Sequence, residues 1–210
     1  MTAADGAETI IMITIRISFM RMTMNEDKTY DIIPLPKETY KGAILPISYT
    51  TTGYYDVSVD GFDVSIRKKT FPLPVTHTPE EYDFPDRLYA DWWDGAEAVG
   101  VVDGGELLAA IETCPEEWSN RLIVTELWVD SRLRGQGYGR RLIEAAISRA
   151  RSEKRRAVIL ETQSCNMNAI GFYRHMGFSL IGFDTCCYSN DDPGRHEVRL
   201  DLGLLLDAEK

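Results

Sequence analysis

The sequence predicts an α+β fold with a mixed, mostly antiparallel central sheet. Three observations predict it. Between residues 97 and 129, short apolar segments alternate with turn residues, as in an antiparallel meander. A glycine-rich turn and a helical repeat then lead to another apolar strand, Ala157–Thr162. A second helical repeat and two further strand patterns follow, so helices and strands are interleaved in the second half of the chain.

Size and composition favour a single domain. With 210 residues, 44% of them hydrophobic, the chain is long enough to bury a substantial core. We divide it into an N-terminal extension (1–28), an N-terminal part of the same domain (29–95) and a core (96–210). The extension contains a strand pattern, Ile10–Ile17, that is far shorter than a membrane span, and its acidic start is unlike a signal peptide. We therefore expect a cytoplasmic protein without membrane association, and we leave open whether residues 1–24 are ordered or native.

The N-terminal part of the domain combines scattered prolines with one clear hairpin. Alternating apolar residues in Tyr55–Val59 and Phe62–Ile66 flank Asp60-Gly61, which we expect to form the turn. A helical turn is expected within Lys37–Leu45, and a short helix at Pro79–Tyr82, where proline opens the pattern.

The core begins with the meander and ends with a strand pair. Meander strands are expected at Glu97–Val102, Leu107–Thr113 and Leu122–Val129, separated by polar turns. Two late strands are expected at Ser179–Tyr188 and Glu197–Leu206, and the second alternates well. Its apolar end permits a homodimer.

The turn after Leu122–Val129 carries the clearest chemical signal. Apolar residues recur at Leu142, Ala146 and Ala150, which gives the following helix one apolar face. Between strand and helix lies Arg134-Gly135-Gln136-Gly137-Tyr138-Gly139. Glycines let a ligand approach the backbone, and a helix start offers unpaired N–H groups and the positive end of the dipole. The spacing matches neither the G-x-G-x-x-G fingerprint nor the G-x-x-x-x-G-K-[ST] loop. The pattern that remains is Arg-x-x-Gly-x-Gly, which we interpret as a phosphate site of another kind; a loop that needs glycine only for a positive φ is the alternative.

Charge is unevenly distributed along the chain. The total is −10, yet Arg132–Arg156 holds nine basic and two acidic residues, so this segment carries +7 and the remainder −17. A basic pole suits a polyanionic cofactor, and an acidic remainder suits a cationic second substrate. From Arg149 onward we interpret the arginines as a solvated helix face. We expect no nucleic-acid partner, because the overall acidity repels phosphate backbones and no aromatic residues interleave the basic run.

Cysteine and histidine spacing predicts no metal site. The four cysteines include no C-x-x-C pair, and two of them, Cys186 and Cys187, are adjacent, an arrangement that rarely bridges. The three histidines are isolated. We therefore predict reduced thiols and no bound metal.

Two motifs in the core occur in a fixed order. The first is Arg-x-x-Gly-x-Gly at residues 134–139, after a strand and before a helix. The second is Asn-x-x-Ala-x-x-x-Tyr-x-x-x-Gly-Phe at residues 166–178. Together they resemble the acetyl-coenzyme A signatures of the GNAT superfamily of N-acetyltransferases, with one helix and one strand between them. The resemblance covers roughly half the chain. It implies the GNAT fold, in which helices cover both faces of a mixed, mostly antiparallel central sheet, with acetyl-CoA as co-substrate.

The resemblance also implies roles for individual residues. In the superfamily, a backbone N–H of the strand before the turn donates to the oxyanion, here within Leu127–Val129. A tyrosine matching Tyr173 donates to the departing sulfur; the alternative is a core aromatic with its hydroxyl at the rim. The implied cofactor-binding residues are Leu127, Trp128, Val129, Arg134, Gly135, Gln136, Gly137, Tyr138, Gly139, Arg140, Asn166 and Tyr173.

The reaction also needs a base, because an amine with a pKa of about 10 must lose a proton before it attacks a thioester. Glu126 lies on the cofactor strand among apolar residues, where an unpaired carboxylate is costly. If Trp128 faces one side of the sheet, Glu126 shares that side, and Leu127 and Val129 take the other. We predict Glu126 as the base, directly or through a water; an ion pair with a nearby arginine is the alternative.

The acceptor is predicted from a further resemblance. Leu160-Glu161-Thr162-Gln163, the second motif and Gly182-Phe183-Asp184 together look like the streptothricin acetyltransferase branch, in which an amine of the antibiotic's β-lysine moiety is acetylated. This implies direct attack by a primary amine of a small cationic acceptor in a ternary complex, and a link to antibiotic resistance. The alternatives are a protein lysine or N-terminal acetyltransferase and a non-catalytic coenzyme A- or nucleic-acid-binding module. Candidate acceptor-binding residues are Glu112, Glu161, Asp91, Trp92 and Asp94, of which the tryptophan could instead be a packing residue.

Overall fold

The computed structural model describes residues 28–79 and 85–206. The strand expected at Ile10–Ile17 and most of the helix expected at Pro79–Tyr82 lie outside the described residues. From Ile32 onward the chain is one compact unit, which contains every element named below. No helix within the described ranges is long and apolar enough to cross a membrane.

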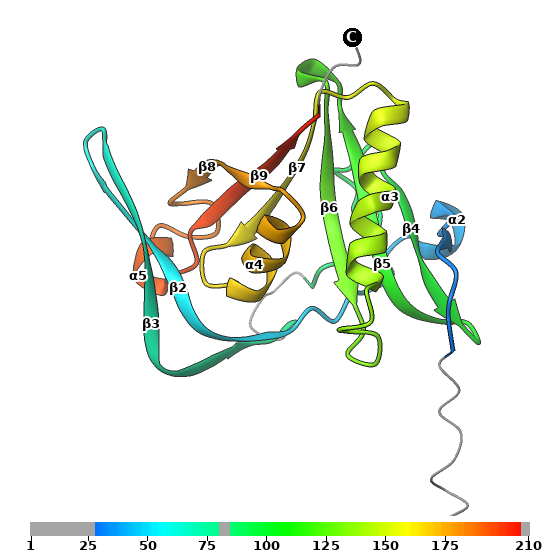
Figure 1. The fold of residues 1–210 in the computed structure, drawn as a ribbon, viewed down its shortest axis with the longest axis horizontal. Helices are drawn as coiled ribbons and strands as arrows, with labels where there is room; N and C mark the ends of the chain where they lie inside the picture. Colours follow the sequence, from blue (N-terminus) through cyan, green and yellow to red (C-terminus); the bar gives the residue numbers. More distant parts are fainter. Residues whose placement is uncertain (1–27, 80–84, 207–210) are drawn as a thin grey trace, which may run out of the picture. The chain divides into compact units, whose positions relative to one another are not determined.

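Seven strands form a mixed sheet in the order β1-β4-β5-β6-β7-β9-β8 (Figure 1). Among the described strands, only β6 and β7 pair in parallel, and the other neighbours are antiparallel. The prediction of a mixed, mostly antiparallel sheet is therefore confirmed. The strands are β1 (Ile33–Pro34), β4 (Glu97–Asp103), β5 (Glu106–Glu116), β6 (Arg121–Val129), β7 (Ala157–Gln163), β8 (Ser179–Asp184) and β9 (Arg199–Leu205).

Two helices lie over one face of this sheet (Figure 1). The first, α3 (Tyr138–Ser152), buries the predicted apolar stripe of Leu142, Ala146 and Ala150. The second, α4 (Met167–His175), follows β7. Because the apolar stripe matches the 3.6-residue period, its burial against the sheet holds α3 beside β5 and β6.

The opposite face has a thinner cover. It includes the one-turn helix α2 (Lys37–Tyr40) and the connector that precedes β4. Helices therefore cover both faces, as predicted, although α2 is much shorter than the helical turn expected up to Leu45. The buried side chains that pack together here include Leu35, Leu45, Leu88, Tyr89, Ala98, Ala110 and Trp128.

Strand ends differ from the prediction in both directions. β5 continues past Thr113 to Glu116, because its residues remain paired with β6. In contrast, β8 ends at Asp184 rather than at Tyr188. Here the carboxylate of Asp184 accepts a hydrogen bond from the backbone N–H of Cys186 at 2.9 Å, which turns the chain away from the sheet.

A long hairpin, β2 (Tyr49–Asp60) and β3 (Asp63–His77), forms a separate two-stranded sheet. The hairpin was predicted, but its turn is Gly61-Phe62 instead of Asp60-Gly61. Gly61 has a φ of 60° and is the first of the two turn residues, the position at which a type II′ turn requires glycine. The one-residue shift places Phe62 at the hairpin tip, where its side chain is fully exposed.

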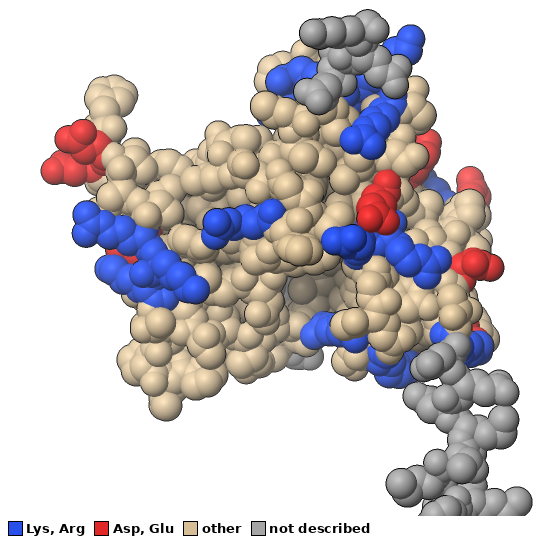
Figure 2. Space-filling model, in the orientation of Figure 1, with Lys and Arg blue, Asp and Glu red and all other residues tan. Residues whose placement is uncertain are grey.

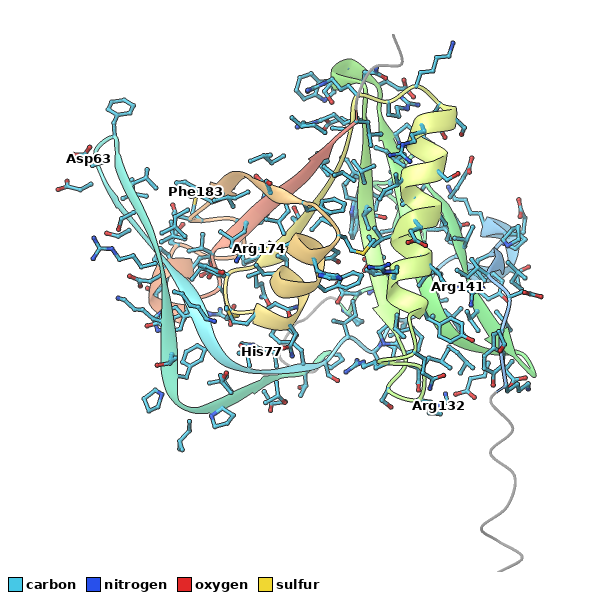
Figure 3. The ribbon with its side chains drawn as sticks, viewed as in Figure 1. Asp63, His77, Arg132, Arg141, Arg174 and Phe183 are labelled. Atoms are coloured by element: carbon cyan, nitrogen blue, oxygen red, sulfur yellow. The ribbon has the colours of Figure 1, made fainter. Side chains whose placement is uncertain are left out.

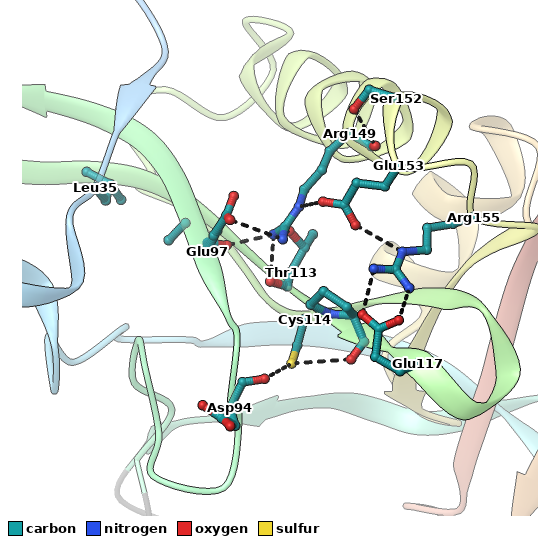
Figure 4. A network of polar contacts seen from close by, with 12 residues as sticks. Leu35, Asp94, Glu97, Thr113, Cys114, Glu117, Arg149, Ser152, Glu153 and Arg155 are labelled. Atoms are coloured by element: carbon teal, nitrogen blue, oxygen red, sulfur yellow. Dashed lines mark hydrogen bonds and ion pairs between the residues drawn. The ribbon is translucent and has the colours of Figure 1, made fainter.

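Basic residues at and after the end of α3 form a network (Figure 4). Arg149 donates to the carbonyl and the hydroxyl of Thr113 at 3.0 and 2.8 Å and pairs with Glu153 at 2.6 Å. Arg155 pairs with Glu153 and Glu117 at 2.9 and 2.8 Å. The side chains of Arg149 and Arg155 are only 16% and 11% exposed. The interpretation of a solvated face is therefore wrong for these two arginines.

Candidate active site

The glycine-rich turn between β6 and α3 is open to solvent. Gly135 and Gly137 have φ values of 77° and 85°, a left-handed conformation that strains other residues. A Cβ atom at either position would meet nothing within 4 Å, so conformation rather than crowding requires glycine. Arg134 and Gln136 are also exposed. A ligand can therefore approach the backbone of this turn directly.

The start of α3 fits an anion. Gly137 is its N-cap, no side chain caps it, and its first turn contains no acidic residue. A helix start of this kind offers the positive end of its dipole to a phosphate. Nη2 of Arg140 lies 3.4 Å from Nε2 of His175 on α4. Basic side chains also lie over α3 and α4 on the face shown in Figure 2. These groups fit the phosphates of the predicted cofactor.

A gap opens between β6 and β7 beside this turn. Their parallel pairing ends at Val124 and Leu160, although β6 continues to Val129 and β7 to Gln163. In the described chain, β6 beyond Val124 therefore has no partner strand on that side. Unpaired N–H groups of such a segment need an acceptor. Leu127–Val129 lies in this segment, so a backbone N–H donating from it to the oxyanion stays a prediction.

Tyr173 projects from α4 and is buried. Its ring centroid lies 5.3 Å from that of Phe172 and 5.8 Å from that of Phe178. Burial raises the pKa of Tyr173 above its usual value, and the nearby charge of Glu126 raises it further. The hydroxyl therefore keeps its proton at neutral pH, and the two predicted catalytic residues lie within electrostatic reach of each other.

Glu126 is half-buried among other carboxylates. Burial raises the pKa of Glu126 to about 9, and the charges of Asp86, Glu112 and Glu161 contribute. A hydrogen bond from the backbone N–H of Arg87 opposes this shift. Among the described residues no arginine side chain is paired with this carboxyl. In the free protein at neutral pH, Glu126 is therefore mostly protonated.

The carboxylate of Glu112 lies on the same face but has a different environment. Glu112 is opposite Glu126 in the β5–β6 ladder, and Trp128 packs into the core on this face, as predicted. Glu112 is fully buried and accepts hydrogen bonds from the backbone N–H of Tyr89 at 2.5 Å and from Oγ1 of Thr125 at 2.8 Å. These contacts tie the connector and a β6 bulge to β5, so Glu112 positions the strand that carries Glu126.

Asn166 begins α4 as its N-cap. Its side-chain oxygen accepts a hydrogen bond from the backbone N–H of Ala169 at 3.2 Å. This contact satisfies one of the free N–H groups at the helix start. Because α4 carries Tyr173, the cap helps to fix the position of the predicted donor; a direct contact of Asn166 with the cofactor stays a prediction.

Three predicted acceptor-binding residues lie on the connector and do not gather around Glu126. Asp91 is exposed and pairs with Lys41 at 2.7 Å. Trp92 is largely exposed, and Asp94 contributes its backbone carbonyl as the acceptor of the Cys114 thiol. The adjacent tryptophan, rather than Trp92, packs against the core.

Glu161 interacts with polar residues that no sequence motif indicated. It pairs with Arg199 on β9 at 3.3 Å. Burial, and then the charge of Glu161, raise the pKa of Tyr188 above its usual value. Asp86 influences Glu126 from the connector. Nothing local in the sequence marks these residues, because strand pairing and the connector alone bring them together.

Metal chemistry has no evident ligand set here. Across residues 28–79 and 85–206, no three His, Cys, Asp or Glu side chains are arranged to hold a metal ion. All four cysteines are free thiols.

Comparison with protein families gives one match over much of the chain. The family model described as "Acetyltransferase (GNAT) family" matches residues 65–178, which is more than half of the 210 residues. The matched range runs from β3 through the end of α4 and contains both motifs.

Individual proteins extend this similarity. The mycothiol acetyltransferase of Propionibacterium freudenreichii subsp. shermanii is 27% identical over 173 residues, which cover 79% of this chain and 54% of that protein. The chain thus spans about half the length of that curated relative. The crystal structure of nourseothricin acetyltransferase superposes with a TM-score of 0.68 and 25% identity, covering 86% of this chain and 100% of the other. A candidate streptothricin acetyltransferase from Bacillus anthracis str. Ames, in complex with acetyl coenzyme A, has a TM-score of 0.65 and 21% identity, covering 85% and 98%.

Proposed function

The chain belongs to the GNAT acetyltransferase family, and from this premise we propose that it transfers the acetyl group of acetyl-CoA to a primary amine of a small cationic acceptor. A streptothricin-type antibiotic is the acceptor that we favour, which would make the protein a resistance enzyme. The observation that carries the proposal is the group of carboxylates around Glu126. The similarity to nourseothricin acetyltransferase, over 86% of this chain, supports the same acceptor class.

A cationic acceptor fits the charge state of this group. An ammonium beside Glu126 would offset the repulsion from Asp86 and Glu161 and lower the raised pKa of Glu126. The pKa of Glu126, about 9 in the free protein, is also close to that of an alkyl ammonium, about 10. The raised pKa makes Glu126 a stronger acceptor for the amine proton than an ordinary carboxylate, which suits a general base.

The remaining groups hold the co-substrate and stabilise charge. Acetyl-CoA supplies the activated acyl group. Arg140 and the start of α3 would bind its phosphates, and a backbone N–H within Leu127–Val129 would donate to the acyl oxygen. Tyr173 would donate a hydrogen bond to the departing sulfur. Because the pKa of its phenol lies above that of a thiol, about 8.5, this hydrogen bond stabilises the thiolate without complete proton transfer.

Tyr173→Phe tests the role of this hydroxyl. We expect acetyl-CoA affinity to persist, while turnover falls roughly 10²-fold or more, as for loss of a hydrogen-bond donor to developing negative charge. Calorimetry measures the affinity, and release of free thiol measures turnover. Tyr40→Phe, on the remote helix α2, is the matched control and should change neither. Unchanged turnover in Tyr173→Phe would remove the assigned role.

An acceptor screen tests the reaction itself. Thiol release from acetyl-CoA is compared with streptothricin, polyamines, aminoglycosides and a lysine peptide. We expect the fastest release with a small polycation. A lysine peptide as the best acceptor would favour the protein-acetylating alternative, and acetyl-CoA binding without thiol release would favour a non-catalytic module.

A further inference from the structure

We propose that the protein forms a twofold dimer in which the tip of the β2–β3 hairpin of each protomer inserts into an apolar groove of its partner. The groove has a volume of about 370 Å³ and lies between the hairpin base, α4 and the last strands of the sheet. It is lined by Tyr55 and Ile66 of the hairpin, Ile170 and Arg174 of α4, and Leu180 and Leu202 of the sheet. This inference does not depend on the proposed function.

The hairpin tip is an exposed apolar surface. Phe62 is fully exposed, and the cross-strand pair Val59 and Val64 is about half exposed. The same face continues along the strands to Val57, which is buried against Ile170 of α4. Contiguous exposed apolar side chains mark contact sites, and a two-stranded hairpin is only marginally stable by itself. The apolar face thus continues past the part that its own protomer covers.

The tip and the groove are complementary in charge as well. Asp60 and Asp63 flank Phe62, and both are exposed. Figure 3 shows Asp63 at the end of the hairpin and Arg174 on α4. Arg174 is exposed and donates to the hydroxyl of Tyr55 at 3.3 Å, which holds its guanidinium at the groove. A docked tip would bring a carboxylate to this cation while its phenyl ring enters the apolar volume.

The geometry selects a second copy of the chain as the occupant. Because Ile66 lines the groove and Phe62 forms the tip, about four residues separate them, roughly 13 Å along a strand. The strands between them are paired without interruption, so a tip cannot bend back into its own groove. Two hairpins that lie side by side in opposite directions can place each tip on the groove of the other. Such reciprocal contacts close a twofold dimer and leave no open end.

The late strands contribute differently from the sequence expectation. Leu202 is buried at the floor of the groove, and the exposed end of β9 at Leu205 is not part of the groove lining. The sequence suggested a homodimer through the exposed end of β9. The dimer that we propose uses the groove between β9, β8 and α4 instead.

Light scattering of the full chain over a wide range of protein concentration tests the dimer. The expected mass is twice the 23.8 kDa of one chain. Phe62→Ser and Arg174→Glu should each weaken association by roughly tenfold or more, the effect of removing a central anchor. Leu73→Ser removes a largely exposed leucine of β3 outside the tip, and it should leave the mass unchanged.

Exchanging the charges across the proposed interface provides a second test. Arg174→Glu combined with Asp60→Arg and Asp63→Arg should restore the dimer that Arg174→Glu alone weakens. Because Phe62 has no packing role within its own protomer, the circular dichroism spectrum of Phe62→Ser should match that of the unaltered chain. A monomer at every concentration, or equal weakening by Leu73→Ser and Phe62→Ser, overturns the proposal.

Discussion

At the scale of single residues, Glu126 links the structure to the chemistry through one protonation equilibrium. Its pKa is raised to about 9 by burial and by neighbouring carboxylates, and the closest of these along the ladder, Glu112, is itself fully buried. A base must be unprotonated to accept a proton. If Glu126 is the base that we propose, the free protein holds it in the inactive, protonated state until a cation arrives or the pH rises.

The pH dependence of acetyl transfer follows from this state. Below about pH 9, kcat/KM for a cationic acceptor should rise roughly tenfold per pH unit, because the unprotonated fraction of Glu126 rises by that factor. Initial rates of thiol release from neutral to alkaline pH measure it. The acceptor amine also titrates, near 10, so Glu126→Gln is the necessary comparison. It should lower kcat/KM and remove the limb near 9; an unchanged profile would assign that limb to another group.

The sequence made Glu126 predictable but not its surroundings. A carboxylate in an apolar strand is unusual enough to be noticed, and alternation placed it on the side of Trp128. The position of Glu112 opposite Glu126 depends on strand register, which shifts at the bulge beside Thr125. Asp86 approaches from a connector with no periodic pattern. Local sequence signals contain neither relationship.

At the scale of elements, substitutions of Asn166, the N-cap of α4, can distinguish a structural role from a cofactor-binding role. Asn166→Ala should lower the free energy of unfolding by about 1 kcal/mol, because the N–H of Ala169 loses its acceptor. Urea unfolding measures this change, and calorimetry measures acetyl-CoA affinity in parallel. Asn166→Ser is the matched control, since serine is also a good N-cap. If serine restores stability but not affinity, Asn166 contacts the cofactor; if it restores both, the cap alone matters.

The network around Arg149 tests how α3 is attached to the sheet. Arg149→Ala should lower the free energy of unfolding by about 1.5–3 kcal/mol, because Thr113 and Glu153 lose hydrogen bonds from a charged donor. Arg151→Ala, at an exposed position two residues further along α3, should change the free energy of unfolding by no more than about 0.5 kcal/mol. Equal effects of the two substitutions would mean that the network is as solvated as the sequence first indicated.

Two predictions about these elements were wrong, the solvated position of Arg149 and the Asp60-Gly61 turn, and each error has a physical cause. Arg149 follows Ala146 by three residues and Leu142 by seven, so it lies on the buried side of α3, a signal that periodicity contains. A long arginine stem can cover apolar surface there while its guanidinium reaches Thr113. The hairpin turn is harder to predict, because Asp60-Gly61 suits a type I′ turn whereas Gly61-Phe62 suits type II′. The choice shifts the register by one residue and exposes Phe62.

At the scale of the whole molecule, the order of strands exceeds what local patterns can specify. The meander predicted that β4, β5 and β6 are neighbours, but nothing in the sequence predicted the gap between β6 and β7 beside the turn. β9 lies between β7 and β8 because its residues pair on both sides, with Leu202 opposite Leu160 and Leu180. That placement follows from packing over the whole sheet. The polar group formed by Glu161, Arg199 and Tyr188 depends on the same placement, so it could not be predicted either.

The stability of the free protein should depend on pH in two opposite ways. The pKa values of Glu112 and Glu126 are raised in the fold, so the native state binds more protons than the unfolded chain between the usual value of 4.5 and, for Glu126, about 9. The free energy of unfolding therefore falls as the pH rises through that window. Asp130, held by Arg132, has its pKa lowered from 3.8 to about 2. Its contribution is present above 3.8 and is lost as the pH falls toward 2.

These opposing slopes predict maximal stability of the ligand-free protein in weakly acidic solution, and urea unfolding at a series of pH values measures it. Glu126→Gln should flatten the alkaline decline without altering the acidic one, and Asp130→Asn should do the reverse. A cationic acceptor that binds beside Glu126 should also flatten the alkaline side, because it stabilises the carboxylate in the native state only. If the free energy of unfolding instead rises steadily from acidic to alkaline pH, the pKa of Glu126 is not raised by burial and neighbouring carboxylates. The argument for a cationic acceptor would then fail.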